Sequence, residues 1–380
     1  MNNSQRKGND SVISAAAVGS AREAGQDPNQ RKPFYKKGSE PNMSIDGVRT
    51  KRIWALDFTK GVLVLVMVLY HWLNYFIGSN GFFYRYLLFL PPSFICISGF
   101  LISRVYVSRF RITGDKVTRR MVIRGLKVLA IFILLNVTTV GVAAFRSGSG
   151  MGWYDFLSRS ALWSIFISGN MRGGRLVAFY ILLPISYLLI LSACIMVIFR
   201  YYRNIYHIVT IIALMAIMIL RATGRTSPTL DLMSIGCLGI SAGYISIEKV
   251  DRFLKRPHTI LLAYVLYVLG ITLWNTPYPL QVMGVLLTLM LIYRLGTASS
   301  GDGQIPQLLA LLGKYSLFGY IAQIAILQCL RGALRVEYSE SIPAFSLALA
   351  VILTVISVIA VDWARARVSI VDHLYRVVFS

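Results

Sequence analysis

The chain has 380 residues, of which 56% are hydrophobic and only 14% are charged. A soluble domain carries roughly 25% charged and 45–50% apolar residues, so this composition excludes an ordinary soluble protein. The net charge of +23 does not indicate binding to nucleic acid, because most basic residues stand in short segments between apolar runs, as they do in membrane proteins.

The two ends of the chain differ from its middle. Residues 1–50 are rich in small, polar and basic residues and have almost no apolar periodicity. Such a segment cannot bury enough apolar surface to fold, and it contains no signal-peptide hydrophobic run. We therefore expect a disordered basic cytoplasmic tail over residues 1–50, a transmembrane bundle over residues 51–362, and a cytoplasmic C-terminal tail over residues 363–380.

The apolar runs between the tails are long enough to cross a hydrocarbon layer of roughly 30 Å as helices. They are continuous rather than alternating, which favours helices over barrel strands. The predicted fold class is all-α, a polytopic membrane helix bundle of about ten transmembrane helices. The predicted spans are 54–77, 83–107, 121–145, 174–199, 205–222, 229–247, 258–276, 278–295, 313–331 and 342–362.

Basic residues predict the orientation of the bundle. With the N-terminus in the cytoplasm, 29 of the 39 Lys and Arg residues fall on the inner side. This bias indicates that both termini are cytoplasmic, in a multi-pass protein of the cytoplasmic (inner) membrane. Residues 153–173 hold an apolar run too short to cross, so we expect an interfacial or re-entrant segment there. The four cysteines have no paired spacing, and no metal site is predicted.

The first span carries three ionisable residues, Asp57, Lys60 and His71, which are costly in a membrane helix. Asp57 and Lys60 are three residues apart, and the eleven-residue step to His71 differs from whole helical turns by about 20°. All three side chains therefore project from one side of the helix. We call this row of Asp57, Lys60 and His71 the stripe. His71 is about 16 Å further along the axis than Lys60.

Two interpretations of the stripe remain open. In the structural one, Asp57 and Lys60 form an ion pair at the membrane edge, and His71 is a buried imidazole that hydrogen-bonds a neighbouring helix. In the functional one, His71 is a general base or an acyl-accepting nucleophile. The shared register of His71 with a lysine favours function, since a packing histidine does not need it.

The second span contains Pro91-Pro92 and, one to two turns later, Ser98-Gly99. The prolines remove backbone hydrogen bonds and should kink or unwind the helix at mid-depth, and Ser98 and Gly99 allow close approach of a neighbouring helix. Beside the stripe, this arrangement would make room for a ligand.

Four motifs along the chain, in this order, resemble the motifs of one protein family. The string LDFTKG with the histidine that follows it, at 56–71, resembles the opening motif of the membrane acyltransferase-3 superfamily, which includes glucan-succinylating and heparan acetyltransferase-type branches. ISGFLIS at 97–103 resembles that family's "SGF" motif, FYILLP at 179–184 its "fYlllP" motif, and GKYSLFGY at 313–320 its "lGk.Syslyl" motif. The resemblance covers residues 52–362.

The chain departs from the family pattern at two places. Gln323 stands where the family often has a histidine after the last motif, which leaves a second catalytic histidine unsupported. Residues 173–178 (GGRLVA) replace the "hlWfL" string that usually precedes "fYlllP".

The resemblance implies transfer of an acyl group, usually acetyl, from a cytosolic acyl-CoA to a sugar hydroxyl of a cell-surface or lipid-linked glycan. His71 would be catalytic with Asp57 and Lys60, and no cofactor would be tightly bound. Membrane lipids are the remaining expected partner. The residues that we expect to bind donor phosphates and thioester are Lys60, Arg119, Arg120, Arg124 and Ser98, although positive-inside anchoring also explains the arginines. The residues that we expect at the acceptor are Tyr315, Ser316, Tyr320, Gln323 and Arg175, although interhelical hydrogen bonding or snorkelling would explain several of them.

Two rival functions remain open. One is a transporter or flippase for a lipid-linked sugar, with the stripe as a proton relay; the other is a bundle that both moves and transfers the acyl group. We find no internal repeat that pairs the two halves of the chain, which disfavours an inverted-repeat transporter.

Overall fold

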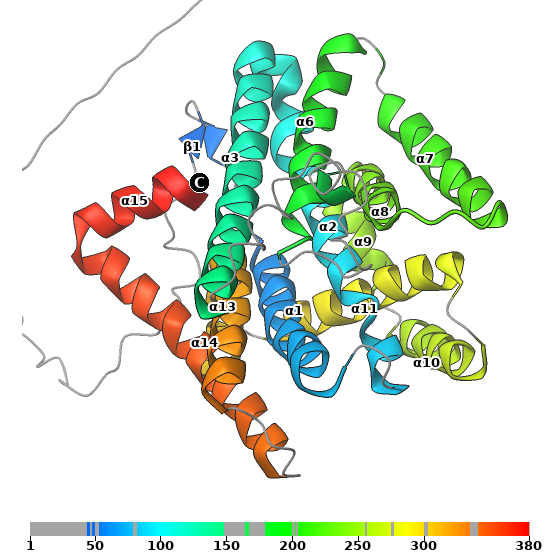
Figure 1. Cartoon of the computed structure of the whole chain (residues 1–380). Helices are drawn as coiled ribbons and strands as arrows, with labels where there is room; N and C mark the ends of the chain where they lie inside the picture. Colours follow the sequence, from blue (N-terminus) through cyan, green and yellow to red (C-terminus); the bar gives the residue numbers. More distant parts are fainter. Residues whose placement is uncertain are drawn as a thin grey trace, which may run out of the picture. The chain divides into compact units, whose positions relative to one another are not determined.

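The computed structural model describes residues 44–45, 48–49, 53–78, 82–147, 164–166, 179–199, 202, 204–254, 257–274, 277–299, 303–334 and 341–379, all within the unit Phe34–Ser380. Helices account for nearly all of them (Figure 1). The elements are β1 (Ser44–Ile45), β2 (Val48–Arg49), α1 (Trp54–Trp72), η1 (Leu73–Ile77), η2 (Phe82–Leu87), α2 (Leu90–Leu101), η3 (Ile102–Val107), α3 (Ser108–Ser147), α6 (Leu182–Ile198), α7 (Ile205–Ala222), α8 (Pro228–Ala242), α9 (Ile247–Phe253), α10 (Pro257–Leu273), α11 (Tyr278–Ala298), α12 (Gln304–Lys314), α13 (Ser316–Leu334), α14 (Ser341–Arg367) and α15 (Ser369–Phe379).

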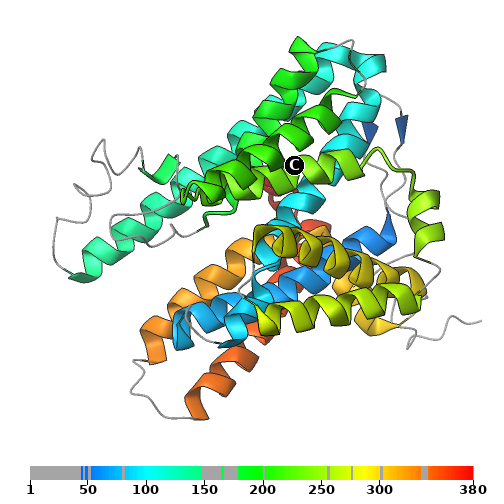
Figure 2. The same cartoon turned by 90° about the vertical axis from the view of Figure 1, so that its right-hand side faces the viewer.

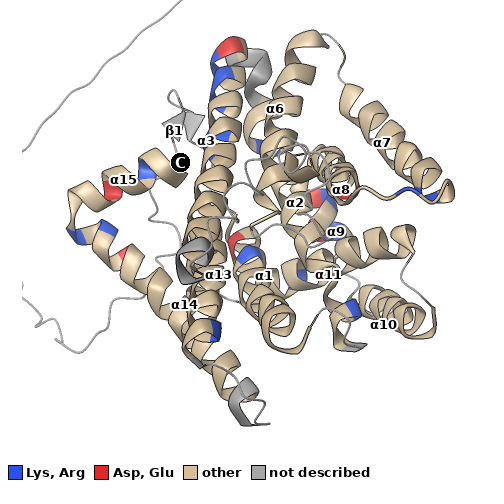
Figure 3. Ribbon diagram, viewed as in Figure 1, with Lys and Arg blue, Asp and Glu red and all other residues tan. Residues whose placement is uncertain are grey.

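The helices have the length and composition of membrane spans. Among the described residues, six are long and apolar enough to cross a bilayer, or up to eight if each of two bent pairs forms one span. The pairs are α8–α9, bent by 99°, and α12–α13, bent by 89°; α6 and α10 are apolar but shorter. Figure 3 shows charged residues mainly toward helix ends, such as one end of α3 and the turn from α14 to α15. The predicted all-α membrane bundle is confirmed, while the count of ten spans and the cytoplasmic termini stay predictions.

Both predicted tails contain regular structure. The strands β1 and β2 pair antiparallel, with Ser44 opposite Arg49 and Ile45 opposite Val48. At the other end, α14 continues to Arg367 and α15 follows after one residue, so the segment expected to be a simple tail is helical. Of the predicted interfacial segment 153–173, only the helical residues 164–166 are described.

Helix α1 packs against α12, α11, α13 and α2 (Figures 1 and 2). Two glycines bring α1 and α12 together backbone to backbone. A Cβ atom built on Gly61 would lie 1.8 Å from the Leu309 carbonyl oxygen, and one built on Gly313 would lie 1.7 Å from the Asp57 carbonyl oxygen. No larger residue fits at either position without displacing a helix, so this contact fixes the Asp57 end of α1 against α12.

The prolines of the second span interrupt it before α2 rather than within α2. The 3₁₀-helix η2 ends at Leu87, and Pro91 and Pro92 stand in the first turn of α2, where a missing N–H group needs no intrahelical partner. Beyond them, α2 packs closely on α8: a Cβ built on Gly99 would lie 2.1 Å from the Gly236 carbonyl oxygen. The Ser98 hydroxyl donates to the Phe94 carbonyl oxygen within α2, at 2.8 Å.

Candidate functional site

Helix α1 is continuous from Trp54 to Trp72, so the predicted register of the stripe holds. Lys60 Nζ and Asp57 Oδ1 form an ion pair at 2.6 Å, and both side chains are largely buried, at 16% and 5% exposure. His71 follows three helical turns later, about 16 Å along the axis. Immediately beyond it the helix widens into the π-helical turn η1, a form that often occurs at functional sites.

His71 lies among aromatic rings from three elements. Its imidazole meets the Tyr70 ring edge-on, at 5.3 Å between centroids, and the Tyr320 ring of α13 at 5.8 Å. Tyr320 in turn packs edge to face against Phe179, at 6.3 Å. The Nε2 atom of His71 is buried and has no hydrogen-bond partner among the described residues. A buried polar atom in this condition is costly, so this atom is a candidate to bind a ligand.

Gln323 is another buried polar group without a partner among the described residues, as is the Thr288 hydroxyl of α11. It lies one turn after Tyr320 on α13, on the same side of that helix, and its side chain is 0% exposed. Neither its amide nitrogen nor its amide oxygen has a partner among the described residues. Gln323 therefore places a hydrogen-bond donor and an acceptor inside the bundle about one turn beyond Tyr320, at the position where a histidine is common in the family that the chain resembles.

Apart from Tyr320, sequence reasoning did not identify the aromatic residues around His71 as site residues. The Tyr84 hydroxyl, from η2, donates to the Tyr70 hydroxyl at 2.5 Å, and the two rings stack at 4.9 Å. Phe179 has φ 59°, a left-handed conformation that is strained for a bulky residue. No motif distinguishes Tyr70 or Tyr84, whereas Phe179 belongs to the recognised FYILLP string and its backbone strain is visible only in three dimensions.

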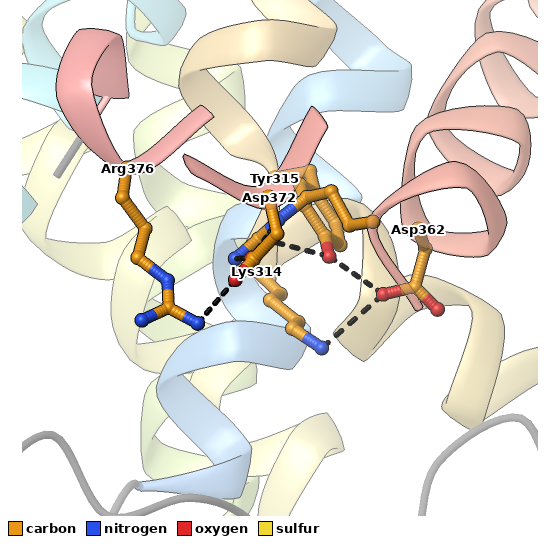
Figure 4. Close-up of polar contacts among 6 residues, drawn as sticks. Lys314, Tyr315, Asp362, Asp372 and Arg376 are labelled. Carbon is orange, nitrogen blue, oxygen red and sulfur yellow. Dashed lines mark hydrogen bonds and ion pairs between the residues drawn. The ribbon is translucent and has the colours of Figure 1, made fainter. Parts of the chain in front are cut away.

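The motif GKYSLFGY lies at the bend between α12 and α13, and its residues point to two places. Gly313 contacts Asp57 and Tyr320 contacts His71, so both ends of the motif reach the stripe. Tyr315 does not: its hydroxyl donates to Asp362 Oδ1 at 2.6 Å and accepts from Arg365 Nη1 at 3.0 Å (Figure 4). Ser316, the first residue of α13, is half-buried.

Lys314 and α15 complete this second polar group, which we call the C-terminal cluster. Lys314 Nζ lies 3.2 Å from Asp362 Oδ1, and Arg365 Nη2 lies 2.7 Å from Asp372 Oδ1 (Figure 4). Arg376 pairs with the other oxygen of Asp372. These two guanidinium groups, Arg365 foremost, hold the pKa of Asp372 below its ordinary value. The cluster therefore ties α15 to the bend between α12 and α13.

The predicted donor-binding arginines lie on α3, which packs mainly against α6 and η3. Arg119 and Arg120 are exposed, and Arg124 Nη1 donates to the Tyr106 hydroxyl at 3.1 Å. Their expected position beside Lys60 stays a prediction. Arg175 lies outside the described residues.

The helices form a bundle, and one membrane span carries buried ionisable groups. The chain is therefore an integral membrane protein with a polar site inside its bundle. Residues 53–362 match the family model described as an acyltransferase domain. The chain therefore belongs to acyltransferase family 3, as its motifs predicted. Its general activity is that of a membrane acyltransferase. No curated protein and no solved structure has significant similarity to it.

Proposed function

We propose that the chain transfers an acyl group, in the first instance acetyl, from a cytosolic acyl-CoA to a hydroxyl of a cell-surface or lipid-linked glycan, in the cytoplasmic membrane. The observation that carries the proposal is the pair of buried groups without partners, His71 Nε2 and the Gln323 amide. His71 contacts the Tyr320 ring, and Gln323 follows Tyr320 by three residues on α13. We therefore propose that one ligand binds both groups.

In this proposal, the acyl donor lies along the stripe on α1. Lys60, at the Asp57 end of α1, neutralises donor phosphates, with the α3 arginines as further cationic groups. The pantetheine arm then extends along α1, so that the thioester reaches His71. Asp57, paired with Lys60 at 2.6 Å, orients the ammonium group. Ser98, Tyr315 and Ser316 stay candidates for contacts to the two substrates.

Two chemical routes use His71. In the first, Nε2 accepts the proton of the acceptor hydroxyl, the oxygen attacks the thioester carbon, the C–S bond breaks, and the CoA thiolate takes the proton. In the second, Nε2 attacks the thioester carbon, the C–S bond breaks and the CoA thiolate leaves; the acceptor hydroxyl oxygen then attacks the acyl carbon, the C–N bond to Nε2 breaks, and the hydroxyl proton passes to the thiolate. In both routes the Gln323 amide N–H groups are suited to stabilise the negative charge on the carbonyl oxygen.

The test is an assay of the purified full-length protein in lipid nanodiscs with radiolabelled acetyl-CoA, with and without a lipid-linked glycan. The expected result is label on the glycan or, without acceptor, on the protein or in released acetate. Succinyl-CoA assayed in parallel identifies the acyl group. Intact acetyl-CoA, together with movement of the lipid-linked sugar across a vesicle membrane without donor, would overturn the proposal in favour of a transporter.

A further inference from the structure

Helix α15 has an apolar side that no described residue covers. Ile370, Leu374 and Val377 are 69%, 56% and 50% exposed. Their spacing of four and then three residues places them in one row along the helix, and Val378 lies beside the row. An eleven-residue helix that turns such a row to water would lose the free energy of burying it.

The opposite side of α15 is the one that contacts the rest of the chain. The Tyr375 ring meets the Tyr315 ring edge-on at 5.3 Å, and it stacks on Phe379 at 4.8 Å. The Arg365 guanidinium lies over the Tyr375 ring, 4.1 Å from its centroid. These contacts, together with the Arg365–Asp372 ion pair, fix the rotation of α15 about its axis and so keep the apolar row pointing away from the bundle.

The position of α15 indicates what covers the row. Only Val368 separates α15 from α14, the helix that contains the candidate span Ala344–Arg367. Near the end of that span, the exposed Trp363 ring lies 4.5 Å below the Arg367 guanidinium. Trp and Arg are enriched where a span leaves the hydrocarbon layer, so α15 begins at the depth of the lipid headgroups.

The charges near α15 suit a lipid surface. Arg365, Arg367 and Arg376 lie close to the α14–α15 turn, and the nearby acid Asp372 is already paired with two of them. An open hollow beside the polar side is lined by Ser369, Asp372, His373 and Arg376, and Ile370 of the apolar row also lines it. It leaves room for water and headgroups beside the helix.

We infer that α15 is a membrane-surface helix, which lies in the plane of the phospholipid bilayer at the end of α14 with Ile370, Leu374 and Val377 inserted among the acyl chains. Amphipathic helices with cationic polar sides bind bilayers in this orientation. The apolar row then continues the lipid-facing side of α14, where Ile352 and Ile356 are also exposed. This inference does not depend on the proposed acyl transfer.

The test uses spin labels on the full-length protein in nanodiscs that contain anionic phospholipid. In a background with the four native cysteines replaced by alanine, Leu374→Cys places a label on the apolar row. Ser369→Cys, an exposed position on the polar side of the same helix, is the matched control. Accessibility is measured with oxygen, which partitions into lipid, and with a water-soluble nickel chelate.

The expected result is a higher ratio of oxygen to nickel accessibility at residue 374 than at residue 369, with Val377→Cys repeating the value at 374. Equal ratios at all three positions, with ready nickel access, would overturn the inference, because the row would then face water. Dipolar broadening between labels of two chains at residue 374 would also overturn it, because a second copy would then cover the row.

Discussion

The site around His71 and the C-terminal cluster both contain polar side chains in a largely apolar protein. They differ in whether those side chains have hydrogen-bond partners. In the C-terminal cluster, Tyr315, Asp362 and Asp372 all have charged or hydroxyl partners within 3.2 Å. At the other site, His71 Nε2 and the Gln323 amide are buried with none among the described residues. Paired polar groups hold helices together, whereas unpaired buried ones have donors and acceptors to offer to a ligand or water.

The first variant that tests this difference is His71→Ala. We expect transfer to fall by about 10²–10⁴-fold, the usual contribution of a general base, while the protein stays folded and inserted. Acyl transfer by the purified variant, next to size-exclusion and thermal-unfolding profiles of the same sample, checks the expectation. Wild-type activity in the variant would remove His71 from the chemistry.

Gln323→Leu separates a ligand-binding amide from a structural one. Removing a stabilising hydrogen-bond donor for the reacting oxygen costs on the order of 10²-fold in kcat at a preorganised site. Because the amide has no protein partner among the described residues, its loss should leave the thermal midpoint unchanged or slightly raised. A variant that is markedly destabilised but fully active would instead assign Gln323 to packing.

Gly313→Ala tests the contact that holds the stripe against α12. The added methyl group would lie 1.7 Å from the Asp57 carbonyl oxygen, so we expect a loss of about 1–3 kcal/mol in the free energy of unfolding. The matched control is Gly270→Ala on α10, where the nearest atoms would lie at 3.6 Å. Denaturation of both variants in the same detergent gives the comparison, and equal stabilities would contradict it.

Tyr315→Phe removes one hydroxyl from the C-terminal cluster. Its bonds to Asp362 and Arg365 should contribute about 1 kcal/mol to stability, and we expect nearly wild-type transfer, since the hydroxyl is engaged away from His71. Thermal unfolding and a kinetic assay check both expectations. A large rise in KM for the acceptor with unchanged stability would return Tyr315 to substrate binding.

The smallest expected effect is a dependence of α15 docking on pH. The pKa of Asp372 is lowered by its hydrogen bonds to Arg365 and Arg376, so its ion pairs stabilise docking fully above the ordinary carboxyl range near pH 4. That stabilisation is lost as the pH falls through the lowered pKa. A fluorophore at residue 379 should report release of α15 at acid pH, and Asp372→Asn should remove the dependence.

The register of the stripe could be predicted from sequence, because the period of a helix fixes which of its own residues share a side. The partners on other helices could not. His71 meets Tyr320, and Tyr315 meets Asp362, which is 47 residues away in the chain. Nothing local distinguishes these two tyrosines of one motif, and tertiary packing alone sends them in different directions.

The bend at Tyr315 was missed for a related reason. The predicted span began at residue 313 and left residues 304–312 outside any helix, so α12 itself was not predicted, and no proline marks the point where it ends. The helix α15 was missed because a short segment after the last span was interpreted only by its charge. The sequence does predict this helix, because the apolar residues 370, 374 and 377 stand at helical spacing.

Under the proposed function, the unbroken helix between Lys60 and His71 would also set a minimum length for the donor. A molecule that contacts both side chains has to span about 16 Å along α1, and the close backbone contact at Gly61 and Gly313 prevents α1 from sliding to shorten that distance. Small activated acids such as an acyl phosphate cannot reach from one residue to the other. A carrier with a long thiol arm can, so on this proposal reach alone would select among acyl donors before any recognition of the acyl group begins.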